Sequence, residues 1–282
     1  MSHSLFLSVK GGLSGALMGD FFSQFPSHSS LYLSENLAQV SPYLKIALAG
    51  FQSIVNTHDL TQKSWLIQLA THHEGLLHHK NSLTVGQSAI ALMPLTVYRH
   101  ENTKKLEEDL VNISKLWLNC SSTYEDLRIW SLFVTLVINQ NTINRQIINQ
   151  LSRHSQTESS QKNLQIIKDC LTKKSTLQQL QSQLEIESQS LVIYQAIYSF
   201  LSIPEYFEIS LLKSTRIGGQ SHTVTILTGF LLGLYHGYLN IPLVWRKYLE
   251  LLPIVREEKI DQLSKNFLHT WQGNYGSSTL NR

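Results

Sequence analysis

The sequence predicts an all-α fold, because three of its features agree on helices. Apolar residues recur at helical spacing along much of the chain. No segment shows the convincing alternation of apolar and polar residues that marks a half-buried β-strand. Glycine and proline fall between the periodic segments, where they begin helices or form loops. With 42% hydrophobic residues among 282, the chain can bury a sizeable core in one large domain or two small ones.

Three apolar stripes identify the clearest helices. The first runs from Leu44 to Val55, the second from Ile113 to Cys120, and the third from Leu127 to Val137. Apolar residues return every three or four positions in each stripe, so they share one helix face. Five prolines stand near the expected helix starts or loops: Pro26, Pro42, Pro94, Pro204 and Pro242.

Two later segments are also expected to be helical. Residues 151–190 are rich in Gln, Ser, Lys and Leu, which favours a pair of surface helices with polar exposed faces over a specific docking segment. The apolar stretch from Val224 to Leu239 is shorter than the roughly 20 residues of a membrane span. We expect it to be a buried core helix. No linker divides the chain, so we expect a single domain over residues 1–270 and a disordered tail over 271–282.

Composition and charge narrow the classes of function. The net charge is +3 without a dense basic run, which argues against a nucleic-acid partner. Cys120 and Cys170 suit a reducing compartment, and we expect both to be buried structural cysteines. The N-terminus lacks the pattern of a signal peptide. We therefore expect a soluble, cytoplasmic protein with no membrane partner.

The histidine-rich segment from His72 to His79 does not predict a zinc site. His73 and His78 are five residues apart, whereas the zinc-protease motif places its histidines four apart on one helix face. His72 and His79 share a face, but seven residues of helix separate them by about 10 Å. We expect a solvated helix end.

The clearest candidate site lies at residues 217–229. Gly218 and Gly219 form a turn that opens into an apolar helix. Such a turn presents backbone N–H groups at the positive end of a helix, which suits an anion. It is equally open that the two glycines only let the helix start tightly, and that Gly229, Gly233 and Gly237 allow close helix packing. Three side chains without a carboxylate follow the turn: Gln220, Ser221 and His222.

Four segments share their order and approximate spacing with the ADP-ribosylglycohydrolase family, which they resemble over most of residues 10–250. The first reads Gly-Ala-Leu-Met-Gly-Asp and the third Thr-Tyr-Glu-Asp-Leu-Arg. In chain order the segments are Gly15–Asp20, Gln87–Leu95, Thr123–Arg128 and Ile217–Trp245. The resemblance implies a compact, all-α orthogonal helical bundle with a cleft for ADP-ribose.

The departures from the family pattern fall at its metal ligands. Hydrolysing members hold two magnesium or manganese ions with an early Thr-Asp-Asp-Thr and a late Asp-x-Asp motif. The early motif corresponds here to residues 41–44, which contain no acid, and Gln220 and His222 replace both late aspartates. The family's histidine and arginine positions carry Tyr124 and Ala91. Two hard cations need several carboxylate oxygens, so we expect no metal cofactor.

We therefore expect a catalytically inactive relative that acts as a binding or scaffold module with an unidentified protein partner. Weak binding of ADP-ribose or a similar nucleotide is compatible with the surviving glycines. The residues expected to line this ligand site are Gly218, Gly219, Gln220, Ser221, His222, Ser88 and Tyr124.

The alternative is a divergent hydrolase of ADP-ribosyl bonds that uses one metal or none. Asp20 or Asp126 would then act as general base, while His222 or Tyr124 would polarise the ligand. A third hypothesis is a structural partner in a larger assembly, which would dock through an exposed helix face such as 160–190.

Overall fold

The computed structural model describes residues 4–24, 39–139, 143, 146–184, 191–216, 220–252, 256 and 259–273. All regular elements in these ranges are helices, which confirms the predicted all-α class. One isolated parallel bridge joins Leu83 to Leu118.

The helices are, in chain order, α1 (Leu5–Gln24), α2 (Pro42–Thr57), α3 (Gln62–His73), η2 (Glu74–His79), α4 (Val85–Ala91), α5 (Met93–Tyr98), α6 (Thr103–Trp117), η3 (Ser121–Thr123), α7 (Tyr124–Asn139), α8 (Gln146–His154), α9 (Glu158–Lys173), α10 (Leu177–Gln183), α11 (Leu191–Ser202), α12 (Phe207–Ser214), α13 (Ser221–His236), η4 (Tyr238–Asn240), α14 (Leu243–Leu251) and α16 (Ile260–Trp271).

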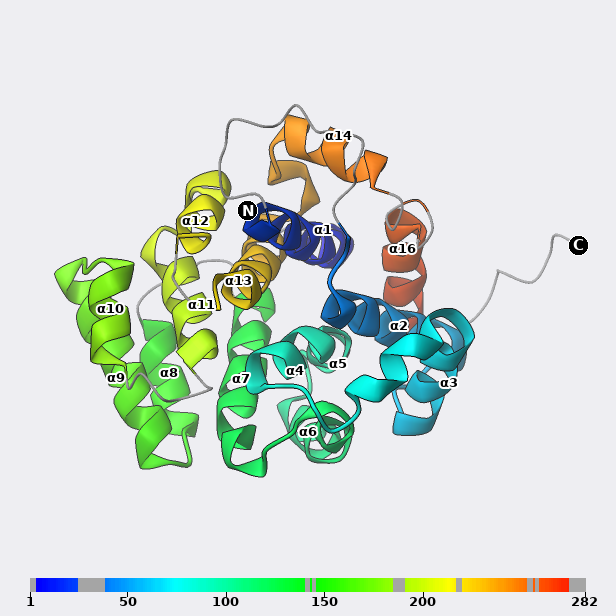
Figure 1. Cartoon of the computed structure of the whole chain (residues 1–282), viewed down its shortest axis with the longest axis horizontal. Coiled ribbons are helices and arrows are strands. Elements are labelled where there is room, and N and C mark those ends of the chain that lie inside the picture. Colours follow the sequence, from blue (N-terminus) through cyan, green and yellow to red (C-terminus); the bar gives the residue numbers. More distant parts are fainter. Residues whose placement is uncertain are drawn as a thin grey trace, which may run out of the picture.

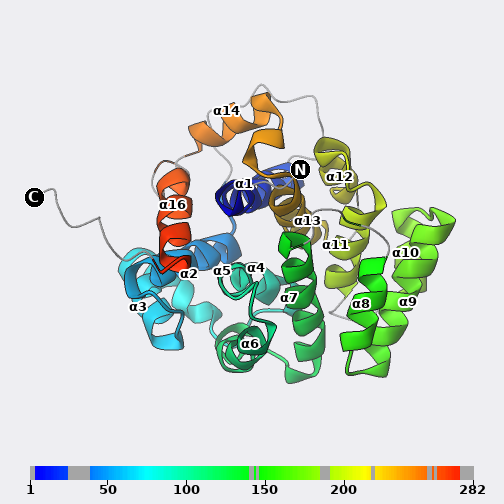
Figure 2. The same ribbon diagram turned by 180° about the vertical axis from the view of Figure 1, so that it is seen from behind.

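Helices α1 and α13 lie side by side in the middle of the molecule (Figure 1). Helices α2, α3 and α16 lie on one side of this pair, and α8 to α12 lie on the other. Helices α4 to α7 cover the lower side and α14 the upper side, as the view from behind in Figure 2 also shows. The central pair is thus enclosed by helices from both halves of the chain.

Glycines allow the backbones of α1 and α13 to touch. A Cβ atom placed on Gly15 would lie 2.0 Å from the carbonyl oxygen of Gly229, and one on Gly233 would lie 1.9 Å from that of Gly11. Neither position has room for a larger residue. Gly19 meets Thr225 in the same way, so the two helices run antiparallel. The end of α1 therefore meets the start of α13.

The three apolar stripes form buried helix faces, as predicted. They belong to α2, α6 and α7, and their main apolar residues are buried. Cys120 is an exception, because α6 ends at Trp117 and Cys120 is the residue before η3. Its side chain is partly exposed and bonds to Ser122, so the prediction of a buried cysteine holds for Cys170 and is wrong for Cys120.

Local sequence signals account for several helix ends. Ser41 accepts a hydrogen bond from the Tyr43 N–H, and Pro42 occupies the first turn of α2, where its missing N–H costs nothing. Pro94 lies in the first turn of α5, and Pro242 precedes α14. Pro26 falls outside the described residues.

The second half of the chain also folds largely as the sequence predicts. Helices α9 and α10 are a surface pair with polar outer faces, and every residue of α13 from Val224 to Leu234 is buried. No helix among the described residues combines the length and apolarity of a membrane span. Helix α16 ends at Trp271, one residue past the expected domain limit, and residues 274–282 of the expected tail lie outside the described ranges.

Replacing Gly15 with Ala should destabilise the protein by roughly 1–3 kcal/mol, because the new methyl group would overlap the Gly229 carbonyl. Urea unfolding measures this loss of free energy. The matched control is Gly75→Ala in η2, where nothing lies within 4 Å of the added atom. Equal effects of the two substitutions would contradict the close approach of α1 and α13.

Candidate functional site

Asp20 is the buried acid of the candidate site. It lies near the end of α1, and its side chain is 1% exposed. The Ser41 backbone N–H donates to Asp20 Oδ2 over 2.7 Å, and Gln24 Nε2 donates to Oδ1 over 3.3 Å. Gln24 Nε2 also donates to the Gln39 carbonyl at 3.1 Å, which ties α1 to the segment before α2. The carboxylate is therefore satisfied by the chain's own donors.

His222 supplies the shortest of these contacts. Its Nε2 lies 2.6 Å from Asp20 Oδ1, and because a carboxylate accepts, Nε2 carries the proton and donates. The imidazole is 43% exposed, whereas Asp20 is enclosed. Within the described chain Nδ1 of His222 makes no hydrogen bond. The imidazole is thus held at one nitrogen and accessible elsewhere, in the first turn of α13.

A second pair of side chains lies next to Ser41. Gln87 Nε2 donates to the Tyr43 hydroxyl over 2.8 Å, while Gln87 also closes the capping box of α4 with Thr84. The rings of Tyr43 and His79 meet edge to face with centroids 5.7 Å apart. Partial burial raises the pKa of Tyr43, and burial together with the nearby His78 lowers the pKa of His79. Tyr43 stays a neutral hydrogen-bonding group.

The histidine segment ends one helix and forms a second, and His72 and His78 are exposed, as expected of a solvated helix end. Helix α3 ends at His73 and the 3₁₀ helix η2 begins at Glu74, so the shared face expected for His72 and His79 does not form. The ring of His79 is instead packed against Tyr43 and His78. Residue spacing alone could not reveal this contact, because it depends on the change of helix type.

Helix α4 connects the two parts of the site. A Cβ atom on Gly86 would lie 2.9 Å from Thr223 Cγ2, so α4 packs directly against the first turn of α13. Gln87 follows on α4 and reaches Tyr43, whereas Ser88 is fully buried. The structure thus brings Asp20, Ser41, Tyr43, Gln87 and His222 to neighbouring elements.

The other residues predicted to bind the ligand differ in how accessible they are. Gln220 precedes α13 and is exposed, and Ser221 is its first residue. Gly218 and Gly219 lie outside the described residues, so both readings of their role stay predictions. Ser88 is too deeply buried to meet a ligand without rearrangement.

Asp126 belongs to a second buried network. The Tyr194 hydroxyl of α11 donates to Asp126 Oδ1 over 2.5 Å, and the Ser160 hydroxyl of α9 lies 3.5 Å from the same oxygen. Burial, with the Asp126 charge next in importance, raises the pKa of Tyr194 strongly. Tyr194 therefore remains a donor, and this carboxylate joins α7 to α9 and α11. No sequence signal linked Tyr194 to this site.

Arg128 anchors the same end of α7. Its guanidinium makes a bidentate pair with Glu125, at 2.7 and 2.9 Å, and reaches Glu107 of α6 at 2.7 Å and the His154 carbonyl. The Gln156 N–H adds a 2.8 Å hydrogen bond to Glu125. These contacts hold the start of α7 against α6 and against the end of α8, so the Thr123–Arg128 segment has a structural role. Residues three apart on a helix are neighbours, so the ion pair between Glu125 and Arg128 could have been predicted from the sequence.

Tyr124 borders a separate pocket. This hollow of about 280 Å³ is lined by side chains of α6, η3 and α7: Val111, Ser114, Lys115, Leu118, Ser121 and Tyr124. Partial burial raises the pKa of Tyr124, so the phenol stays protonated. Its lining is mostly apolar and offers no carboxylate.

The residues at the site do not fit two divalent cations. Ser41, Tyr43 and Gln220 carry neutral oxygens, and His222 suits softer metals than magnesium. No group of three or more His, Cys, Asp or Glu side chains in the described ranges is placed to share a metal ion. Among the residues described here at the site, Asp20 supplies the carboxylate, and it already accepts three hydrogen bonds.

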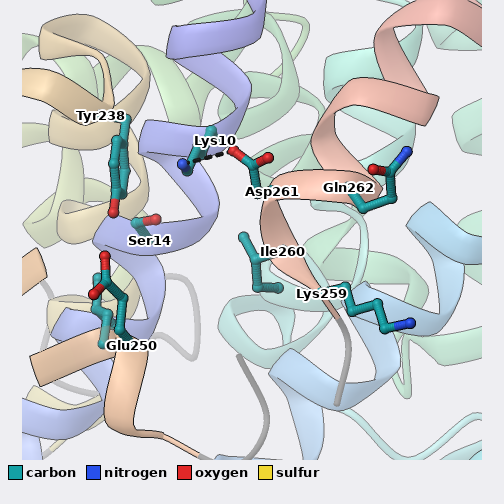
Figure 3. A pocket seen from close by; sticks show the side chains of 9 residues that line it. Lys10, Ser14, Tyr238, Glu250, Lys259, Ile260, Asp261 and Gln262 are labelled. Carbon is teal, nitrogen blue, oxygen red and sulfur yellow. Dashed lines mark hydrogen bonds and ion pairs between the residues drawn. The ribbon is translucent and has the colours of Figure 1, made fainter. Parts of the chain in front are cut away.

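A polar pocket lies beside the first half of α1, away from Asp20 (Figure 3). It measures about 280 Å³ and lies between α1, η4, α14 and α16. Lys10 Nζ donates to Asp261 Oδ1 at 2.8 Å and lies 3.8 Å from the centre of the Tyr238 ring. Hydrogen bonds from Lys10 and Lys265 lower the pKa of Asp261. This ion pair joins the first helix to the last described one.

Two comparisons relate the chain to known proteins. A family model described as ADP-ribosylglycohydrolase matches residues 3–277. A solved structure described as an ADP-ribosylglycohydrolase-related protein complex superposes with a TM-score of 0.66 at 14% identity, over 94% of this chain and 98% of that one. At this identity the likeness shows a shared fold. No curated protein is significantly similar in sequence.

Replacing Arg128 with Met should destabilise the protein by about 3–5 kcal/mol, because Glu125 would remain buried without its cation. Chemical denaturation measures the loss. In the control, Lys265→Met removes an ion pair whose side chains are both about half exposed and should cost less than about 1 kcal/mol. Similar losses for both variants would contradict the structural role of Arg128.

Replacing Asp261 with Asn should lower stability at neutral pH by less than about 1 kcal/mol. The folded-state pKa of Asp261 is lowered, so its contribution is present above the unfolded pKa and is lost as the pH falls through the folded pKa. The stability difference between the wild type and the variant should therefore shrink below about pH 4. Melting temperatures of the wild type and the variant, measured across this pH range, test the prediction. A stability difference that stays constant as the pH falls would contradict it.

Proposed function

Because the chain belongs to the ADP-ribosylglycohydrolase family, we propose that it is a catalytically inactive member that acts as a binding or scaffold module. Its cleft would retain weak, metal-independent affinity for ADP-ribose or a similar nucleotide. A protein partner, not yet identified, would use this module in the cytoplasm.

The contacts of Asp20 carry this proposal. Family hydrolysis needs carboxylates that are free to coordinate cations, and here the site's carboxylate is bonded to His222, Ser41 and Gln24. Asp20 is 1% exposed and accepts three hydrogen bonds, so a cation could use its oxygens fully only if the 2.6 Å contact with His222 or the bond from the buried N–H of Ser41 were given up. Displacing a buried donor leaves its hydrogen bond unsatisfied, which costs about 1–3 kcal/mol.

The same arrangement supports binding of an anion. His222 lies in the first turn of α13, where the helix dipole is positive. The accessible imidazole could donate to a diphosphate if Nδ1 is protonated, and Gln220 and Ser221 add polar side chains at the same helix start. Tyr43 and Gln87 supply neutral hydrogen-bonding groups nearby. A ligand held in this way would need no metal ion.

A hydrolase with metal-free chemistry is the second candidate, and the Asp20–His222 pair favours it. A buried carboxylate that orients an imidazole is an arrangement that general-base catalysis uses. His222 would take the proton of the attacking water, with Asp20 as its positioning partner. Asp126 is less suited to this role, because its carboxylate is enclosed with Tyr194.

Calorimetric titration of ADP-ribose tests the binding role. We expect the same affinity with magnesium and with chelator, because the recognising groups belong to the chain. His222→Ala should weaken binding about tenfold, through loss of one charge-assisted hydrogen bond. His269→Ala, an exposed histidine on α16, is the matched control. Binding that requires magnesium would contradict the proposal; no heat from a folded protein in either condition would exclude the ligand and leave the scaffold role.

An assay for release of ADP-ribose from a modified protein separates the two candidates. The binding module predicts no release with manganese or with chelator. Metal-free release that disappears in both His222→Ala and Asp20→Asn would establish the hydrolase instead. Manganese-dependent release at enzyme-like rates would contradict both candidates.

A further inference from the structure

The Ser14 pocket, the polar hollow between α1, η4, α14 and α16, lies apart from the Asp20–His222 pair (Figure 3). Ser14 precedes Asp20 by six residues, which is about 9 Å along α1. The hollow measures about 280 Å³. Pockets for drug-sized ligands measure roughly 300–1,000 Å³, so this one has room for a small metabolite.

Ser14 contributes a buried hydroxyl to this pocket. The residue is 3% exposed, and its hydroxyl makes no hydrogen bond to any residue that the structure describes. Two other buried serines within helices, Ser131 and Ser264, instead donate to the carbonyl oxygen four residues earlier. A buried hydroxyl without a partner costs free energy. A ligand group in the pocket would supply the missing hydrogen bond.

Two more oxygen-bearing side chains line the same side of the pocket. Tyr238 of η4 and Glu250 of α14 lie with Ser14 on the left in Figure 3. Burial, with the Glu250 charge next in importance, raises the pKa of Tyr238, so the phenol and the carboxylate are near each other. Within the described chain neither the phenol oxygen nor the carboxylate makes a hydrogen bond or ion pair. These three side chains together suit a group with three N–H donors, such as an ammonium.

The start of α16 forms the opposite side of the pocket. Its first backbone hydrogen bond runs from the Leu263 N–H to the Lys259 carbonyl, so the N–H groups before it have no partner within the helix. Lys259 is exposed, and its side chain makes no capping hydrogen bond. Asp261 of the first turn is neutralised by Lys10 and Lys265. This end of α16 therefore suits a carboxylate.

We propose that the Ser14 pocket binds a free α-amino acid with an apolar side chain. Its ammonium group donates to the Glu250 carboxylate and to the hydroxyl oxygens of Ser14 and Tyr238. Its carboxylate lies at the start of α16, beside Lys259. Each charge of the zwitterion thus meets the opposite charge on its own side of the pocket.

The remaining lining and the charge balance select this class of ligand. Leu249 and Ile260 line the pocket and supply apolar surface for the side chain of the amino acid. Within the described ranges neither Glu250 nor Lys259 has an ion-pair partner. A ligand with an anionic group alone would leave Glu250 unmatched, and one with a cationic group alone would leave Lys259 unmatched.

Calorimetric titration of the full chain with L-leucine tests the proposal. We expect saturable binding. Two analogues each lack one charge of leucine: isocaproate has no ammonium group, and isoamylamine has no carboxylate. Each should bind at least about tenfold more weakly, because one charge-assisted contact is lost. A folded wild type that binds no leucine, or an analogue that binds as tightly as leucine, overturns the proposal.

Substitutions in the pocket locate the bound leucine. Glu250→Gln should weaken binding about tenfold through loss of the charge opposite the ammonium group, and Ser14→Ala about fivefold through loss of one hydrogen bond. The matched control is Glu208→Gln, an exposed acid on α12 outside the pocket. Circular dichroism would verify that the variants fold. Leucine binding that Glu250→Gln leaves unchanged would place the ligand elsewhere and overturn the proposal.

Discussion

The backbone contact between α1 and α13 determines the geometry of the candidate site. Glycines at every fourth position let the two helices meet carbonyl to glycine, at a separation that no side chain could occupy. Because the pair is antiparallel, it brings the last turns of α1 to the first turn of α13. Asp20 and His222, 202 residues apart in sequence, come within hydrogen-bond distance as a result. The surrounding helices then pack on this central pair.

A buried acid must be neutralised or well solvated by the protein, and this constraint shapes the site. In Asp20 the chain satisfies it internally, with an imidazole, a backbone N–H and a side-chain amide. The adjoining Tyr43 and Gln87 add neutral polar groups to this lining. Such a site is suited to recognising an anion, and much less to holding two divalent cations.

The sequence predicted the helices well, because their apolar residues follow the helical period. It also allowed the close packing of Gly229 and Gly233 to be foreseen as one reading of their spacing. Pairings between distant segments could not be predicted in this way: periodicity does not reveal that His222 reaches Asp20 or that Tyr194 reaches Asp126. Two errors have local causes. Helix α6 ends before Cys120, and the change to a 3₁₀ helix after His73 removes the expected alignment of His72 with His79.

Manganese binding shows whether the protein's own hydrogen-bond donors have taken the place of the metal ions at Asp20. Electron paramagnetic resonance of free Mn²⁺ can be followed as the ion is added to the protein. We expect the signal of free Mn²⁺ to rise as it does in buffer alone, since Asp20 is engaged by His222 and Ser41. Binding of two manganese ions per chain that disappears in Asp20→Asn would contradict it.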